Sequence, residues 1–290
     1  MIEKGNPFLA LRVWSSSSRQ ALNKPLLILF ALGRLSRGLR EVSFTEAEAD
    51  LKNLLREFGG DVHHPRPEYP FWRLQNDGIW VVSPDNFQPN AAGDVPVTAL
   101  RDGGAKGRFS NEVLSWLLAD RDRISAVAQG VLNAYFSDSF HQDLLNAVGI
   151  LPPESVITRR RRDPAFRSAV LTAYRQRCAV CSQDIRIGAL TVGLEAAHIQ
   201  WHQAGGPDSI DNGLSLCSLH HKLFDLGAFT LSENRRILVS EHVTGTERLE
   251  EVLMRYHGNA IALPAHNTQQ ASLNFIHWHR HVRFREKPLP

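Results

Sequence analysis

Two pairs of metal-ligand residues constrain this chain more than any other feature. Cys178 and Cys181 form a Cys-x-x-Cys step, and Cys217 and His220 form a Cys-x-x-His step. Together they supply four tetrahedral ligands, which is the pattern of a structural zinc site with no position open for substrate. The 35 residues between Cys181 and Cys217 are more than a simple finger contains. We therefore expect a folded segment inside the zinc clasp.

The cysteine count also indicates a compartment. The chain has 290 residues and three cysteines, all within this clasp, and an odd number argues against a disulfide framework. Thiols kept for a metal are typical of a reducing compartment, so we expect a cytoplasmic protein. No apolar run reaches the roughly 18–20 residues of a membrane span, and the N-terminus lacks a signal-peptide pattern. We expect no contact with a membrane.

The charge distribution points to a polyanionic partner. The net charge is only +3, but residues 12–40 carry six basic side chains and no acidic one. Residues 159–162 are four consecutive arginines, and the stretch 277–288 is again basic. Such patches suit nucleic acid, although each one taken alone is also compatible with an ordinary solvated face.

Hydrophobic patterns and breaker residues divide the chain into an α+β protein with two domains. Residues 151–164 contain paired prolines and the arginine run, which indicates a linker between a domain at 1–150 and one at 165–290. Asn76-Asp77-Gly78 between two aromatic runs predicts a β-hairpin over 69–83. The alternating His277, His279 and His281 predict a strand with one polar face. Helices are expected at 25–38, 43–60, 110–136 and 164–176.

The segment inside the clasp carries a set of spaced motifs. In order they are Cys-x-x-Cys, Glu-Ala-Ala-His-Ile, Gly-Gly, Asp-Asn-Gly-Leu, Leu-Cys-x-x-His-His and Phe-Asp. Over about residues 175–232 this order strongly resembles the HNH nuclease family. The resemblance implies a ββα-metal module, in which two strands and a helix hold one catalytic divalent cation, Mg²⁺ or Mn²⁺, against a scissile phosphate.

The resemblance also implies a role for each matching residue. His198 takes the place of the general base, since a neutral imidazole accepts a proton from water near pH 7. Asn212 takes the place of the central asparagine, which orients the loop that holds the base. His221 matches the ligand of the catalytic metal, so the adjacent His220 is left to complete the zinc site.

One position departs from the family pattern. Many members carry Asp or His directly before the general base as a second metal ligand, whereas this chain has Ala197. Either Glu195, on the same strand face as Ala197, or Asp225, one helical turn after His221, completes the metal shell, or phosphate and water do. The sequence leaves these alternatives open.

Most of the chain resembles a more specific group. The stretches KPLLILFALGRL and EYPFWRLQNDGIWVV and the C-terminal stretch FIHWHRHVRFR are similar to those of the sulfur-binding-domain HNH restriction endonucleases, which use their N-terminal domain for recognition. That resemblance implies recognition of phosphorothioated DNA, in which sulfur replaces a non-bridging phosphate oxygen. The expected DNA-binding residues are Tyr69, Pro70, Phe71, Arg73, His64, Lys106 and Arg108, with the last two in a Gly-rich loop. The plain alternative is that the aromatic residues form the hairpin core.

The sequence therefore predicts a modification-dependent restriction endonuclease. It would bind double-stranded DNA, contain structural Zn²⁺, and act as a homodimer because two strands need two cuts. Two alternatives remain. One is an HNH endonuclease that reads modified cytosine by stacking a flipped base on aromatic side chains. The other is a zinc-stabilised DNA-binding protein whose nuclease centre is inactive, an option that Ala197 keeps open.

Overall fold

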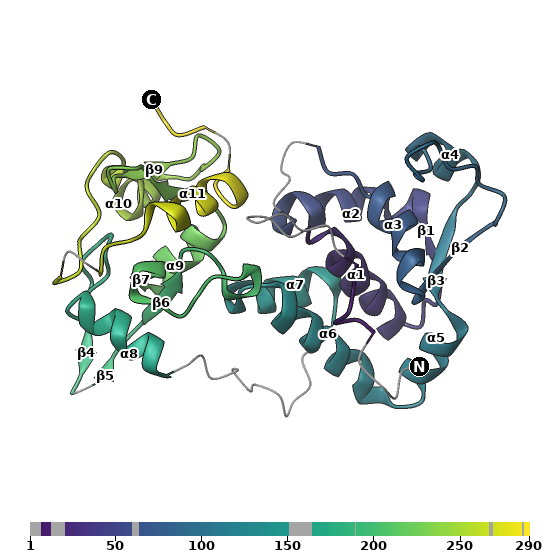
Figure 1. Ribbon diagram of the computed structural model, residues 1–290, viewed down its shortest axis with the longest axis horizontal. Coiled ribbons are helices and arrows are strands. Elements are labelled where there is room, and N and C mark those ends of the chain that lie inside the picture. The colour runs from purple at the N-terminus through teal and green to yellow at the C-terminus, as the bar shows by residue number, and fades with distance from the viewer. Residues whose placement is uncertain are drawn as a thin grey trace. The chain divides into compact units, whose positions relative to one another are not determined.

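A computed structural model describes residues 7–12, 21–59, 64–150, 164–188, 190–266, 269–285 and 287–290. The chain divides into two compact units, Met1–Thr158 and Arg159–Pro290 (Figure 1). Apart from Pro164, the linker expected at 151–164 lies outside the described residues, and so does the arginine run at 159–162.

The first unit is built around helix α1 (Asn23–Ser36), which confirms the helix expected at 25–38. Every residue from Pro25 to Gly33 is buried. The proline is tolerated because it lies in the first turn, where its missing N–H has no partner to lose. Although α1 is strongly apolar, no helix among the described residues is long and apolar enough to cross a membrane.

Four other helices surround α1 (Figure 1). They are α2 (Phe44–Phe58), α3 (Glu68–Arg73), α6 (Arg121–Tyr135) and α7 (Asp138–Val148). The expected helix at 43–60 is confirmed as α2. Its amphipathic spacing buries one face, including Leu51, Leu55 and Phe58, toward the interior.

A three-stranded antiparallel sheet completes the first unit, in the order β1 (Val42–Ser43), β3 (Lys106–Phe109), β2 (Trp80–Ser83). The sequence analysis placed Lys106 and Arg108 in a loop, and that was wrong: they belong to the central strand. Strand alternation turns Gly107 and Phe109 inward and leaves Lys106 exposed and Arg108 half-buried on the other face. A Cβ atom on Gly107 would lie 2.2 Å from the Trp80 ring, so only glycine fits there.

The β-hairpin expected over 69–83 is also wrong. Its first arm is α3 followed by a 3₁₀ turn (Leu74–Asp77), and only its second arm is a strand, β2. The reason is packing. Phe71 and Leu74, three residues apart, both have no exposed surface, which is a helical and not an alternating pattern. Gly78, with φ of 75°, ends the turn where a hairpin bend was expected.

The long helix expected at 110–136 is two helices, α5 (Asn111–Leu118) and α6. The side chain of Asp120 accepts a hydrogen bond from the backbone N–H of Asp122 and caps α6. Such a cap requires extended backbone at Asp120, so the helical run is interrupted there. Among the described residues of this unit, α4 (Val97–Asp102) is the remaining α-helix.

The second unit contains the ββα arrangement that the HNH resemblance implies. Strand β6 (Leu194–His198) pairs antiparallel with β7 (Gly213–Cys217), and α9 (Ser218–Asp225) follows directly. Helix α8 (Pro164–Ala173) packs against both strands and ends three residues before the expected position, because Arg175 and Gln176 have positive φ. The other elements are β4 (Arg186–Ile187), β5 (Leu190–Thr191), β8 (Phe229–Leu231), β9 (Ile237–Val239) and α10 (Glu247–Val252).

The histidine-rich stretch near the C-terminus is a helix, α11 (Leu273–Val282), and the expected strand is wrong. His277 and His281 lie one turn apart on its exposed side. His279 has no exposed surface, since it stacks on Phe224 with ring centroids 3.7 Å apart. The pKa of His279 is lowered to about 3, chiefly because burial disfavours the charged imidazolium.

Candidate functional site

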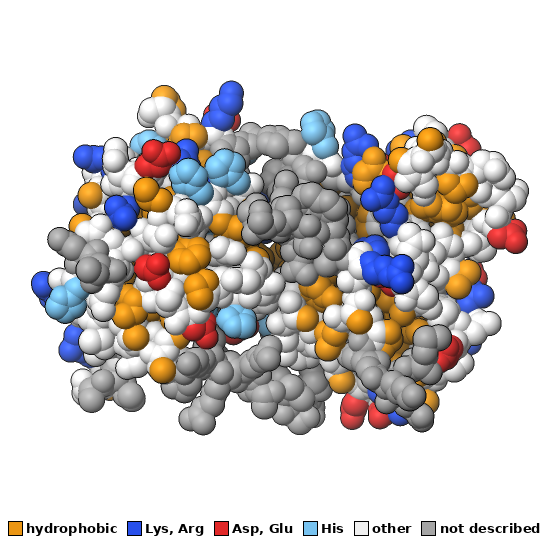
Figure 2. Space-filling model, viewed as in Figure 1, with side chains coloured by type: hydrophobic (Ala, Val, Ile, Leu, Met, Phe, Trp, Pro, Cys, Tyr) orange, Lys and Arg blue, Asp and Glu red, His pale blue; other side chains and the backbone are white. Residues whose placement is uncertain are grey.

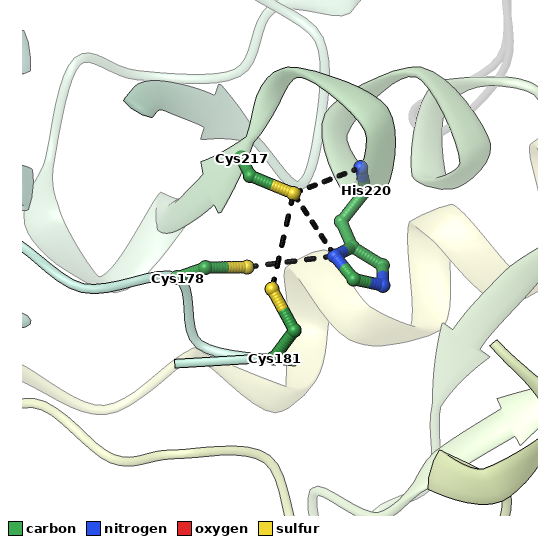
Figure 3. Close-up of side chains that lie close together, drawn as sticks. All are labelled: Cys178, Cys181, Cys217 and His220. Atoms are coloured by element: carbon green, nitrogen blue, oxygen red, sulfur yellow. Dashed lines mark hydrogen bonds between the residues drawn. The ribbon is translucent and has the colours of Figure 1, made fainter. Parts of the chain in front are cut away.

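The four clasp residues come together in the second unit (Figure 3). Their ligand atoms all lie within 4.8 Å of one another. The Nδ1 atom of His220 is 3.1 Å from Sγ of Cys217 and 3.6 Å from Sγ of Cys178, and the sulfurs of Cys181 and Cys217 are 4.0 Å apart. Tetrahedral zinc bonds place two sulfurs about 3.8 Å apart and sulfur and nitrogen about 3.5 Å apart. The residues therefore fit Zn²⁺.

Local contacts prepare this cluster for a metal. The Nε2 atom of His220 donates to the carbonyl of Val252 at 2.7 Å, which leaves Nδ1 as the ligand nitrogen. Hydrogen bonds from Cys181 and Cys217 lower the pKa of the Cys178 thiol well below its usual range. The thiolate is the form of cysteine that binds metal, so these contacts suit Cys178 to a metal site, whereas the hydrogen bonds with Cys178 and Cys181 raise the pKa of the Cys217 thiol.

His221 points elsewhere from the same helix and lies between two carboxylates. Its Nδ1 is 2.5 Å from Oε2 of Glu195, and its Nε2 is 3.3 Å from Oδ2 of Asp225. The Glu195 side chain is 41% exposed, whereas that of Asp225 is 1% exposed. The two acids face different nitrogens of His221, and one imidazole offers only one nitrogen to an ion. Only one of the two acids can therefore share an ion with His221. Glu195, on the Nδ1 side, is therefore the more accessible of the two acids.

His198 lies at the end of β6, where its ring is held on two sides. Its Nε2 is 2.7 Å from Oδ1 of Asp208, and its ring stacks on Phe166 of α8 with centroids 4.2 Å apart. A carboxylate on one ring nitrogen orients the imidazole and selects its tautomer. The sequence analysis did not single out Asp208. Its only signal was its place in the Gly-rich loop before Asn212.

Asn212 closes the loop between β6 and β7. Its Oδ1 accepts from the N–H of Gln200 at 2.8 Å, and its Nδ2 donates to the carbonyls of Gln200 and Pro207 at 3.0 and 2.9 Å. The side chain is fully buried, so all these bonds form away from water. A Cβ on Gly206 would lie 1.9 Å from the Gln200 carbonyl, which requires glycine at this crossing. The clamp holds Asp208, and through it His198.

The expected DNA-binding residues of the first unit separate into surface and core. Tyr69 is half-buried between two guanidinium groups, with Arg66 at 5.4 Å and Arg73 at 5.1 Å from its ring centre. Arg66 also donates to the Tyr69 hydroxyl at 2.8 Å. Phe71 is fully buried, so it is a core residue and the expectation that it contacts DNA is corrected. Pro70 is also buried, while His64 is exposed.

Arg73 is fixed by an acid that the sequence analysis missed. Its Nε and one terminal nitrogen donate to the two oxygens of Asp94, each at 2.6 Å. This bidentate hydrogen bond raises the pKa of Arg73 above its ordinary value. The Trp72 indole donates to the carbonyl of Gly93, so the 93–94 loop is fastened to α3 at two points. The arrangement holds one cation beside the Tyr69 ring.

Lys106 and Arg108 extend the basic surface on the outer face of the sheet. Arg108 is the cross-strand partner of Val81, and Lys106 is that of Ser83. Each cation therefore lies opposite a shorter side chain on the neighbouring strand. Arg108 donates to Oδ1 of Asn111 at 2.6 Å, which orients its guanidinium. Figure 2 shows Lys and Arg side chains among hydrophobic ones on the visible face of the first unit. A surface of this kind suits a phosphate backbone.

Comparisons with known proteins identify both units. Residues 6–152, half of the chain, match the ScoMcrA-like, DNA sulfur-binding domain family. The chain belongs to this family. Residues 178–232 match the HNH endonuclease family, so this sulfur-binding-domain protein also carries a nuclease domain of that type and is a DNA endonuclease.

Solved structures similar to this chain include the sulfur binding domain of ScoMcrA complexed with phosphorothioated DNA, at 20% identity and a TM-score of 0.45. The match covers 50% of this chain and 93% of that one. The sulfur binding domain of SprMcrA, also with phosphorothioated DNA, has 23% identity, covers 50% and 90%, and has a TM-score of 0.43. The modification dependent TagI restriction endonuclease has 23% identity and a TM-score of 0.33, and the match covers 50% of this chain and 44% of that one. A search of the curated proteins finds no match.

Proposed function

We propose that this protein is a restriction endonuclease that cuts DNA carrying a phosphorothioate linkage. The observation that carries the proposal is the union, in one chain, of a DNA sulfur-binding domain with an HNH domain whose His198 is held by Asp208. A reader and a hydrolytic centre on one chain restrict cleavage to DNA that the reader retains. The reader domain is taken to span 1–150 and the nuclease 165–290, joined by a linker at 151–164.

In the reader, Tyr69 and the two arginines beside it support recognition of the sulfur-bearing phosphate. Sulfur is larger, more polarisable and less strongly hydrated than oxygen, so an aromatic and apolar surface favours it. Arg66 and Arg73 supply positive charge for the linkage, which stays anionic. Pro70 follows Tyr69 in α3, the exposed His64 precedes this helix in the chain, and Lys106 and Arg108 bind neighbouring phosphates.

In the nuclease, His198 acts as general base. With Nε2 held by Asp208, Nδ1 is the nitrogen that takes the proton from the attacking water. Phe166 limits rotation of the ring, and Asn212 keeps the loop that carries Asp208 closed. Each of these contacts lowers the entropy that must be lost to reach the reactive geometry.

His221 and Glu195 are the residues that would hold the catalytic divalent cation, Mg²⁺ or Mn²⁺. Their facing atoms, Nδ1 and Oε2, combine a nitrogen and an oxygen donor at a partly open position. Bound there, the ion supplies Lewis-acid stabilisation of the charge on the scissile phosphate and the leaving oxygen. Asp225, facing the opposite nitrogen, orients His221 and is not a ligand.

Further parts of the proposal concern the zinc, the assembly and the compartment. Zn²⁺ in the Cys178, Cys181, Cys217 and His220 cluster serves a structural role, because four protein ligands leave no open position. Two chains act together on double-stranded DNA, since each chain offers one HNH centre for one strand. The reduced thiols of such a cluster suit the cytoplasm.

The test is cleavage of one duplex synthesised with and without a single phosphorothioate, in several sequence contexts. The two phosphorus diastereomers are separated, because a chiral pocket accepts one of them. Wild type is compared with His198→Ala, and with His202→Ala as a matched control, since His202 is exposed and its ring lies 6.2 Å from that of His198. Tyr69→Ala tests the reader.

Each outcome supports a different conclusion about the reader domain and the nuclease centre. Cutting of one sulfur diastereomer only, lost in His198→Ala and kept in His202→Ala, is expected. Equal cutting of all duplexes would retain the nuclease and reject sulfur recognition, and cutting only of duplexes with modified cytosine would identify a different reader. If the protein binds the sulfur-bearing duplex specifically but cuts it neither in Mg²⁺ nor in Mn²⁺, the nuclease centre is inactive.

A further inference from the structure

A buried carboxylate, that of Asp225, faces the proposed metal ligand His221 from the side opposite Glu195. Asp225 is the last residue of α9, and its side chain is 1% exposed. One oxygen, Oδ2, faces Nε2 of His221, and the other, Oδ1, accepts a hydrogen bond from the indole of Trp201 at 2.9 Å. Both oxygens of this buried group are therefore engaged, one by the histidine and one by the loop that follows β6.

The C-terminal segment reaches the same group. Arg283, directly after α11, donates from Nε and from one terminal nitrogen to the backbone carbonyl of Asp225, at 3.2 and 3.1 Å. Its guanidinium also lies 4.3 Å from the centre of the Trp201 ring, which is a cation–π contact. Arg283 thus touches both Asp225 and the residue that binds its carboxylate.

The electrostatics explain why a charged arginine is buried here. Burial lowers the pKa of Arg283 to about 10, and the negative charge of Asp225 opposes that shift. The guanidinium is held in place by its two hydrogen bonds to the Asp225 carbonyl and by the Trp201 ring. Asp225 lies on the Nε2 side of His221, so the opposite nitrogen, Nδ1, faces Glu195.

We propose that Trp201 and Arg283 are positioning residues that hold Asp225, and through it His221, in the orientation required to bind the catalytic cation. The inference rests on the proposed metal-binding role of His221. Three segments distant in sequence, the loop after β6, the end of α9 and the C-terminal tail, then jointly set the metal affinity. Arg283 then contributes to metal binding through Asp225 and His221, without being a ligand itself.

The experiment measures Mn²⁺ affinity of the full-length, zinc-loaded protein without DNA, from the electron paramagnetic resonance signal of free Mn²⁺. Trp201→Phe removes the indole N–H and keeps a ring, and Arg283→Lys keeps the charge and loses the paired donors. Trp278→Phe is the matched control, since the Trp278 indole nitrogen is buried without a hydrogen-bond partner among the described residues. Arg285→Lys is the second, because the Nε of Arg285 donates to the carbonyl of Leu226.

We expect Trp201→Phe and Arg283→Lys to raise the Kd for Mn²⁺ about 10- to 100-fold, as outer-shell changes do at metal sites. The two controls should stay within about twofold of wild type, and all variants should keep their zinc. The ¹⁵N resonances of the His221 ring provide a second readout. These resonances should change in Trp201→Phe and should stay as in wild type in the two controls.

Unchanged Mn²⁺ affinity and unchanged His221 ¹⁵N resonances in Trp201→Phe would overturn the inference, and this variant decides the matter alone if Arg283→Lys fails to fold. His221→Ala separates the inference from the proposal beneath it. If wild type binds Mn²⁺ no better than His221→Ala, both the role of His221 and the inference fail. If His221→Ala weakens binding and Trp201→Phe does not, only the inference fails.

Discussion

The Nε2 atom of His198 lies 2.7 Å from Oδ1 of Asp208, an acid ten residues further along the chain. The pair links the end of β6 to the middle of the following loop. Because Asp208 orients the proposed base, Asp208→Asn should lower kcat about 10- to 100-fold, a part of the 100- to 10,000-fold that a general base contributes.

Cleavage at saturating DNA measures this effect, and DNA affinity should remain unchanged. Asp211→Asn in the same loop is the matched control and should keep wild-type kcat. A full rate in Asp208→Asn would show that the His198–Asp208 contact is dispensable for catalysis.

Removal of the zinc ligand Cys178 should unfold the nuclease unit and spare the reader. Zinc binding and folding are linked in such small sites, with binding free energies of about 10–16 kcal/mol. Cys178→Ser should therefore lose one equivalent of zinc and its second calorimetric transition, while still binding phosphorothioated DNA. Metal analysis and calorimetry on the same sample test this. Full zinc content or an unchanged transition would argue against a structural zinc.

Lys106 and Tyr69 should affect DNA binding differently. Lys106→Ala removes one phosphate contact, so it should weaken modified and unmodified DNA alike and reduce the slope of log K against log salt by about 0.9. Tyr69→Ala should weaken only the sulfur-bearing duplex and leave the slope unchanged. Affinities over a series of salt concentrations measure both. A uniform loss in Tyr69→Ala would assign it to backbone binding.

The reader domain should lose stability in acid because of Glu48. Its carboxylate accepts two hydrogen bonds from Arg101, each 2.6 Å, and these chiefly lower its pKa to about 2. A group whose folded pKa is lowered stabilises the fold above its ordinary pKa, near 4.5, and loses that contribution as pH falls toward 2. With partly exposed partners, the contribution is about 2 kcal/mol.

Urea unfolding at pH 7 and pH 3 measures this contribution. Glu48→Gln should be less stable than wild type at pH 7 and less sensitive to acid. Glu46→Gln on the same helix is the control, because the Glu46 side chain is 70% exposed. Identical pH dependence in wild type and Glu48→Gln would place the acid sensitivity elsewhere.

Some elements followed from local sequence alone. Helices α1 and α2 could be located because apolar spacing and a first-turn proline act within a few residues. The zinc cluster and the ββα order could be located because ligand spacing and motif order are linear properties of the chain. The position of His198 next to the loop between β6 and β7 also follows from the order of the motifs.

Other elements depended on contacts between distant residues. The run from Tyr69 to Trp80 suits either a hairpin or a helix, since a short apolar run has no decisive period. Burial of Phe71 and Leu74 on the same side selects the helix. In the same way, the pattern of His277, His279 and His281 allowed a strand, and the stacking of His279 on Phe224 selects α11.

The sequence by itself determined which side chains are available: the four zinc ligands, the histidines of the HNH motif and the cations of the reader. Only the tertiary structure decided which partner each one has. It put Glu195 and Asp225 on opposite nitrogens of His221, and Asp94 on Arg73. The physical reason is that a hydrogen bond depends on distance and direction in space, and segments far apart in the chain acquire these only when the core packs.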